Sequence, residues 1–177
     1  AITIAVSVLV GGLAVWATLR SANPKRKINW WVRSNTPLFE RPAGDGAMLT
    51  VSLGATRLAN PRIIELVLCY SGDRDVTAEM FYEGKPIKFD FDHAVAAVLD
   101  VASDPADALL PRIDKWQETI PATGGMQRGG LSIEPGLLRR GQTVTVTVLI
   151  DGDEKPVKCA QFPLVDVEQS NVRPGSP

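Results

Sequence analysis

The sequence is poor in the residues that most often carry catalysis or bind metals. It has one histidine, His93, and two cysteines, Cys69 and Cys159. A single histidine leaves little room for a Ser-His-Asp arrangement, and no serine lies in a G-x-S-x-G elbow. The glycine-rich segment GGMQRGG at 124–130 lacks the spacing and the Lys-Ser/Thr pair of a phosphate-binding loop. No catalytic residue and no cofactor is therefore predicted.

The first nineteen residues carry no charge and read AITIAVSVLVGGLAVWATL. A helix of about 20 apolar residues spans a hydrocarbon core of about 30 Å. A cleavable signal peptide is the alternative, but its apolar region is usually shorter and follows a basic stretch. Here Arg20 also occupies the place where cleavage would occur. We therefore expect a transmembrane helix at 1–19, which could also be the last span of a longer protein.

Four basic residues follow this stretch closely: Arg20, Lys25, Arg26 and Lys27. Basic residues beside a span collect on the cytoplasmic side, near anionic lipid headgroups. The flank at 20–27 therefore predicts a bilayer contact and a cytoplasmic domain after it. Beyond residue 39 the chain holds 14 basic and 20 acidic residues, a net charge of −6. Nucleic acid is excluded as a partner, because it requires a basic face.

The remainder of the chain has the rhythm of short β-strands. Residues 143–150, TVTVTVLI, alternate threonine and valine, which predicts a strand with a buried valine face. Asp151-Gly152 is a hairpin-turn signal, so 156–162 should return as the partner strand. Further strands are expected at 28–33, 48–53, 63–70, 77–82, 87–91, 94–101 and 131–133.

Eight or nine short strands with no long helical pattern between them favour an all-β sandwich over an α/β fold. We expect this domain at 28–166 and a disordered tail at 167–177. One segment, 103–130, breaks the rhythm, and we interpret it as an insertion of loops and short helical turns across an edge or end of the sandwich.

Four apolar residues of this insertion have helical spacing: Leu109, Ile113, Trp116 and Ile120. Pro111 would interrupt a continuous helix, so two short turns are expected. Loops on a rigid scaffold commonly carry recognition. These four residues are therefore the candidate contacts for a partner.

Asp90, Asp92 and His93, in the sequence DFDH, are the only tight cluster of metal-ligand types. On a strand the two carboxylates would share a face, and with the imidazole they could hold a divalent cation. The simpler interpretation is a strand end with solvated acids and a polar loop histidine. That interpretation is favoured, because a metal site needs more ligands than this spacing supplies, and no metal is predicted.

Cys69 and Cys159 each fall in an expected strand. In a reducing compartment they should remain thiols that pack as small hydrophobic side chains. A disulfide stays open as the alternative if the domain lies on the other side of the membrane.

Two segments, LSIEPGLLRRGQTVTVTVLIDG at 131–152 and NPRIIELVLCYSG at 60–72, resemble immunoglobulin-like domains of bacterial surface and membrane proteins. The resemblance covers about a quarter of the chain. It implies an immunoglobulin-like sandwich that serves as a binding or scaffolding module without catalytic residues. The chain departs from antibody-type domains, since no core tryptophan lies between two cysteines at the usual spacing.

Three functions remain open at this point. The first is a membrane-tethered interaction module that binds an unknown protein through loops or an exposed edge strand. The second is a ligand-sensing membrane effector whose β domain binds a small molecule, which requires a pocket. The third is an enzyme that uses Asp90 and Asp92, which requires a cleft around those residues.

Overall fold

The computed structural model describes residues 26–39, 51–120 and 126–172. Within these ranges lie eleven strands and two short 3-10 helices. The strands are β1 (Lys27–Pro37), β2 (Val51–Leu53), β3 (Thr56–Leu58), β4 (Pro61–Tyr70), β5 (Ile87–Asp90), β6 (Val95–Asp104), β7 (Ile113–Ile120), β8 (Met126–Ile133), β9 (Thr143–Asp151), β10 (Lys158–Gln161) and β11 (Glu168–Asn171), and the 3-10 helices are η1 (Ala78–Met80) and η2 (Tyr82–Gly84).

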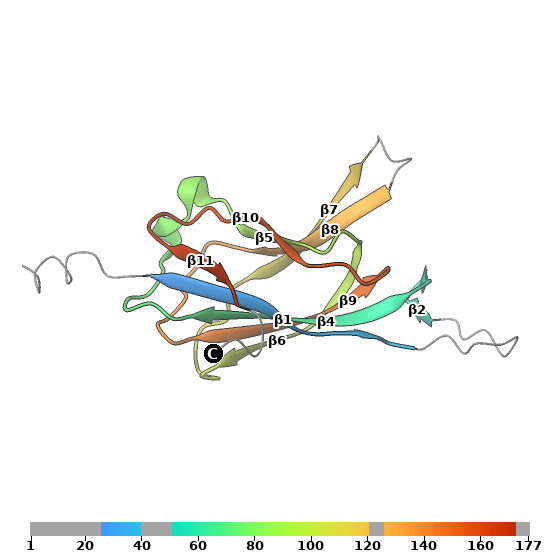
Figure 1. Ribbon diagram of the computed structural model, residues 1–177, viewed down its shortest axis with the longest axis horizontal. Coiled ribbons are helices and arrows are strands. Elements are labelled where there is room, and N and C mark those ends of the chain that lie inside the picture. The colour runs from blue at the N-terminus through green and yellow to red at the C-terminus, as the bar shows by residue number, and fades with distance from the viewer. Residues whose placement is uncertain (1–25, 40–50, 121–125, 173–177) are drawn as a thin grey trace, which may run out of the picture.

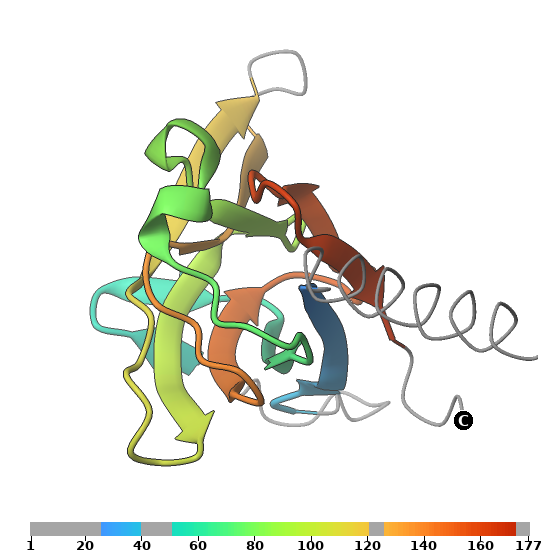
Figure 2. The ribbon, with the colours of Figure 1, turned by 90° about the vertical axis from the view of Figure 1, so that its left-hand side faces the viewer.

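The strands form two stacked sheets, which confirms the expected all-β, sandwich-like arrangement (Figures 1 and 2). The larger sheet has the order β11-β1-β4-β9-β6, and the smaller sheet has the order β10-β5-β8-β7. Strands β2 and β3 form a separate hairpin. Every pairing is antiparallel except that of β11 with β1, which is parallel.

The centre of the larger sheet is the β4–β9 ladder, in which Leu66 pairs with Val146. The valines of β9 are buried and its threonines are partly exposed, as the alternation at 143–150 predicts. The strands expected at 28–33, 63–70, 87–91, 94–101 and 131–133 are also confirmed, with boundaries shifted by a few residues.

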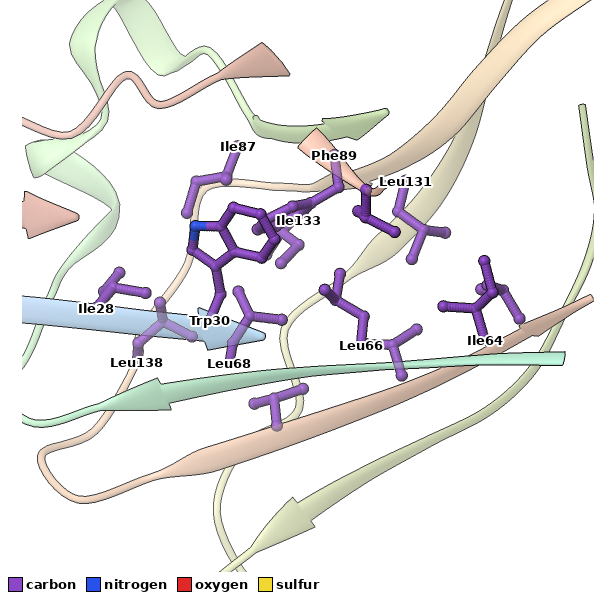
Figure 3. Packing of buried hydrophobic residues seen from close by; sticks show 14 of the residues in the cluster. Ile28, Trp30, Ile64, Leu66, Leu68, Ile87, Phe89, Leu131, Ile133 and Leu138 are labelled. Carbon is purple, nitrogen blue, oxygen red and sulfur yellow. The ribbon is translucent and has the colours of Figure 1, made fainter. Parts of the chain in front are cut away.

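The core lies between the two sheets and is lined mainly by the inward faces of β1, β4 and β9 in the larger sheet and of β5 and β8 in the smaller one (Figure 3). Trp30 of β1 meets Phe89 of β5 edge-to-face, with 5.2 Å between ring centroids and 66° between ring planes. Such aromatic pairs are favourable beyond their buried area. Leu66, Leu68, Leu131 and other aliphatic side chains complete the packing, so both sheets contribute to a single core, and the larger sheet contributes more of it.

The strand expected at 77–82 is wrong. Val76 and Phe81 form only isolated bridges, to Leu138 and Leu164, and η1 and η2 occupy the segment. The chain crosses here from the larger to the smaller sheet. Its backbone therefore bonds locally, for example from the N–H of Phe81 to the O of Ala78 at 3.2 Å.

The hairpin expected after Asp151 is also wrong. The returning strand β10 pairs with β5 of the smaller sheet and not with β9. The N–H of Gly152 donates to the O of Asn60 at 3.0 Å, so this turn is tied to the chain before β4. Beyond it the chain changes sheets.

The helical interpretation of 103–130 is wrong as well. β6 continues to Asp104, and β7 and β8 form an antiparallel hairpin in which Ile113 pairs with Ile133. Pairing between these two consecutive strands overrides the local helical spacing, because the ladder satisfies the backbone groups of the segment. The tail expected at 167–177 is wrong in part, because β11 at 168–171 pairs with β1.

The span expected at 1–19 lies outside the described residues, as do Arg20 and Lys25 of the basic flank. Among the residues that are described, no helix is long and apolar enough to cross a membrane.

Candidate interaction surface

β6 forms one edge of the larger sheet. It pairs with β9 on one side, and no described strand pairs with it on the other (Figure 2). Its pairing shifts register twice, between Val95 and Ala97 and between Val98 and Asp100. Bulges of this kind are common at sheet edges.

The hydrogen bonds at the end of the β4–β9 ladder show at which neighbouring strand the N–H and C=O groups of each β9 residue point. The N–H of Tyr70 donates to the O of Gln142 at 2.9 Å. Along an antiparallel ladder, every second residue directs both backbone groups at the same neighbour. The C=O of Gln142 points at β4, so the backbone groups of Thr143, Thr145 and Thr147 point at β6.

The partners of these threonines on β6 are Asp104, Ala102 and Asp100. Their N–H and C=O groups therefore point at β9. The residues between them, Val101 and Ser103, direct their N–H and C=O groups away from β9. This outward row of backbone groups, together with the side chains of 100–104, is termed the β6 edge.

The side chains of the β6 edge divide between the two faces of the sheet. Asp100, Ala102 and Asp104 share the outer face with the threonines of β9 and are exposed. Val101 lies on the inner face and packs against the core. Leu99, at the second bulge, is 49% exposed although it is a large apolar residue.

The opposite end of β6 is covered by Lys115 of β7. Its ammonium donates to the carbonyl O of Ala96 at 3.0 Å. Ala96 lies within the first register shift, where the regular alternation is interrupted, so its carbonyl is available to β7. A lysine beside an edge strand blocks further pairing there. The outward backbone groups of Val101 and Ser103 lie farther along β6, at the other side of the second register shift.

The segment after β6 is anchored by a buried glutamine. Gln142 is 1% exposed, and its Nε2 donates to Ser103 Oγ at 2.9 Å and to the O of Leu109 at 3.0 Å. The loop is thereby fixed beside the end of β6, while Leu109 stays 63% exposed. Leu110, its neighbour, is exposed too.

The four residues predicted to contact a partner do not form one face. Leu109 is exposed, whereas Ile113 is partly buried against the core. Trp116 is partly buried, and its Nε1 lies 3.2 Å from both the O of Phe89 and the O of Leu131. The side chain of Ile120 lies outside the described residues. Of this set, Leu109 alone is both described and freely accessible.

Asp90 and Asp92 are each paired with a basic residue and do not converge. Asp90 is 1% exposed and accepts hydrogen bonds from the guanidinium of Arg128, with Nε at 2.6 Å. Asp92 accepts from Lys155 Nζ at 2.8 Å, and this hydrogen bond, the largest cause, holds the pKa of Asp92 below its usual range. Burial opposes this effect, and the charges of Lys155 and Arg128 add to it.

The DFDH cluster therefore has the form of a structural ion-pair cluster. The two aspartates already have cationic partners. His93 packs against Gly152, where an added Cβ would overlap the imidazole ring. Within the described ranges, no three His, Cys, Asp or Glu side chains gather in a way that could hold a metal ion.

The described residues of the basic flank belong to the sandwich. Lys27 is the first residue of β1, and its Nζ lies 3.3 Å from Glu168 Oε1 of β11. Arg26 precedes it and packs over Gly72. These two residues therefore join the flank to the larger sheet.

Neither cysteine forms a disulfide. Cys69 lies on β4 of the larger sheet and Cys159 on β10 of the smaller one. Both are partly buried. Burial raises the pKa of the Cys159 thiol, which keeps it protonated and weakly nucleophilic.

The interior of the sandwich is closely packed. The cavity beneath Pro111 has a volume of about 10 Å³, which is near the smallest space that holds one water. A wider surface hollow of about 400 Å³ lies at the end where β1 begins. It is lined by Arg26, Asp75, Thr77, Glu79, Met80, Val165 and Asp166.

Comparison with known proteins gives no assignment, because the chain matches no protein-family model and no curated protein. The β6 edge was missed in the sequence, because an edge is defined by pairing order and the residues 94–101 read only as a strand. The exposed Asp100 and Leu99 on a strand that is otherwise rich in alanine and valine are the signal that could have indicated it.

Proposed function

We propose that the chain is a non-catalytic β-sandwich module of immunoglobulin-like type that binds a protein partner through the β6 edge. In this proposal residues 1–19 tether the module to a membrane, with the sandwich on the cytoplasmic side. The observation that carries it is the outward direction of the N–H and C=O groups of Val101 and Ser103. Such groups are a template for an added strand.

The surroundings of the β6 edge support strand addition. Natural sheets commonly protect their edges with very short strands, charges or bulges. β10 and β11 have four residues each, and Lys115 covers the Ala96 end of β6. The 99–104 part of β6 carries the second bulge and the exposed Asp100 and Asp104, which protect it against partners that do not match those charges. Among the described residues, no basic side chain covers it. Its exposed Leu99 adds an apolar contact beside the open backbone groups.

The tether places this edge near the bilayer. Seven residues lie between Leu19 and Lys27, so the eight steps from one to the other reach at most about 28 Å when fully extended. The Asp104 end of β6 lies at the same end of the sheet as the start of β1, since Asp104 pairs with Thr143, Thr143 with Cys69, and Cys69 with Asn29. A membrane-associated partner would therefore reach it readily.

A site-specific crosslink tests the proposal in the full chain in its native membranes. A photo-crosslinking amino acid at Ala102 should give an adduct of discrete mass, and the same group at Asp73, which is exposed outside β6, should not. Val101→Pro should remove the adduct, because it deletes an outward N–H. Val101→Ala is the matched control, which loses the side chain and keeps the N–H. An adduct that survives Val101→Pro would exclude strand addition.

A second function is favoured by the 400 Å³ hollow beside Arg26. We infer that a small polar ligand bound there could act on the segment that joins the sandwich to the tether. Small amines and carboxylates should then raise the melting temperature of the full chain, and Thr77→Trp, which fills the hollow, should abolish the shift. No shift with the unaltered chain would remove this alternative.

A further inference from the structure

We propose that the strand received by the β6 edge is an extended basic segment of another protein, with Lys or Arg at alternate outer-face positions. This inference rests on the proposed function, because it specifies the chemistry of the partner for the same edge. It is drawn from the charges that flank the open backbone groups.

The outer face of the β6 edge carries two carboxylates at a fixed spacing. Asp100 and Asp104 lie on the same face with Ala102 between them, and all three are exposed. Neither carboxylate has an ion-pair or hydrogen-bond partner among the residues that the structure describes. Asp104 follows Asp100 by four positions, which corresponds to about 13 Å along a strand. An added strand would pair with both carboxylates if it carried two basic residues four positions apart. The residue midway between them would lie beside Ala102, which accommodates many kinds of side chain.

A second copy of this chain fits the edge poorly. Antiparallel pairing of Val101 with Ser103 of a second copy uses all the outward backbone groups, but it sets Asp100 opposite Asp104 twice. Like charges directly opposite each other are destabilising. Shifting the register to pair Val101 with itself places the bulge at Leu99 opposite Ser103 and breaks the ladder. Shifting it the other way places Pro105, which has no N–H, in the pairing.

Lys115 restricts where the basic segment can lie. Its ammonium donates a hydrogen bond to the carbonyl O of Ala96, at the opposite end of β6 from Asp104. A lysine or arginine of the partner is repelled there and attracted at 100–104. Specificity commonly combines an attractive and a repulsive element in this way. The net charge of −6 beyond residue 39 adds a long-range attraction for a basic partner, which salt screens.

The test measures binding of two fluorescently labelled peptides to the full chain in micelles of an uncharged detergent. In one peptide lysine alternates with valine, and in the other glutamate alternates with valine. Fluorescence anisotropy should show binding of the basic peptide about tenfold tighter than binding of the acidic one at low salt. Asp100→Lys with Asp104→Lys should reverse this preference. Asp73→Lys with Glu118→Lys, which makes the same charge change at exposed sites outside β6, should keep it.

Each remaining outcome separates the two proposals. If both peptides bind equally well and Val101→Pro abolishes both, the edge function stands and the basic partner is excluded. If the basic peptide binds equally well to Val101→Pro and to the unaltered chain, strand addition fails and the basic partner fails with it. If the unaltered chain dimerises and Val101→Pro makes it monomeric, a second copy occupies the edge and the inference is overturned.

Discussion

Lys115 on β7 donates a hydrogen bond to the carbonyl O of Ala96 on β6, with 3.0 Å between Nζ and O. The bond joins the edges of the two sheets at one point, because β7 is the edge of the smaller sheet and β6 the edge of the larger. It covers the first part of β6 and leaves 99–104 open. The difference between the two parts of one strand is the basis of the proposed function.

Proline should be tolerated at Val101 and not at Ala102. Proline lacks an N–H, and the N–H of Val101 points outward whereas that of Ala102 bonds β9. We expect Val101→Pro to lower the free energy of unfolding by about 1 kcal/mol, mostly through lost side-chain packing. Ala102→Pro should cost about 3 kcal/mol or more. Urea denaturation followed by tryptophan fluorescence measures both, and equal costs would mean that the assigned directions are wrong.

The Asp90–Arg128 pair should stabilise the packing of β5 against the outer half of the β7–β8 hairpin. Asp90 is buried and Arg128 is partly exposed, so Arg128→Ala leaves a buried carboxylate with the N–H of Asp92 as its remaining donor. We expect a loss of about 2 kcal/mol. Adding Asp90→Asn should recover part of it, since the uncompensated charge is removed. Additive losses in this double-mutant cycle would show that the two side chains act independently.

The Asp92–Lys155 pair should give the domain a dependence on acid pH. The pKa of Asp92 is lowered in the folded state, so its contribution is fully present above the unfolded pKa of about 3.9. It is lost as the pH falls through the lower folded pKa. Both side chains are partly exposed, so the contribution should stay below about 1 kcal/mol. Lys155→Ala should remove this part of the pH profile of stability, and an unchanged profile would exclude the pair as its source.

Gly152 should resist substitution because of His93. A Cβ at position 152 would overlap the imidazole ring, so Gly152→Ala should destabilise the domain by about 1–3 kcal/mol. His93→Ala in the same chain should restore most of this loss. Gly130→Ala is the contrasting variant, because its Cβ would overlap the backbone carbonyl of Phe89 and no side-chain change can relieve it. The melting temperatures of Gly152→Ala, of Gly152→Ala with His93→Ala, and of Gly130→Ala measure these effects.

Regular alternation made part of this fold predictable. Residues 143–150 and 63–70 alternate because one face of each strand is buried and the other is not. The β7–β8 hairpin lacks that signal: the apolar Trp116 and Ile113 fall on opposite faces, and the exposed Lys115 shares a face with Ile113. The spacing of Leu109, Ile113, Trp116 and Ile120 matches a helix by chance, and it therefore predicted helical turns where the structure has a β-hairpin.

The order of the strands within each sheet could not be predicted from the sequence. Nothing in 158–161 shows that this strand joins β5 and not β9, because local pattern specifies a strand and not its neighbour. The same limit concealed the β6 edge, whose significance depends on what lies beside it. The DFDH cluster shows the converse, since its ligand types were visible but their partners, Arg128 and Lys155, are distant in the sequence.

Residue-specific amide exchange of the full chain in detergent micelles, measured by NMR, tests the open edge most directly. The N–H groups of Val101 and Ser103 should exchange much faster than those of Ala102 and Asp104, which bond β9. The basic peptide should then slow exchange at Val101 without changing it at Ala102. Slow exchange at Val101 in the chain alone, equal to that at Ala102, would contradict the open β6 edge and the function proposed for it.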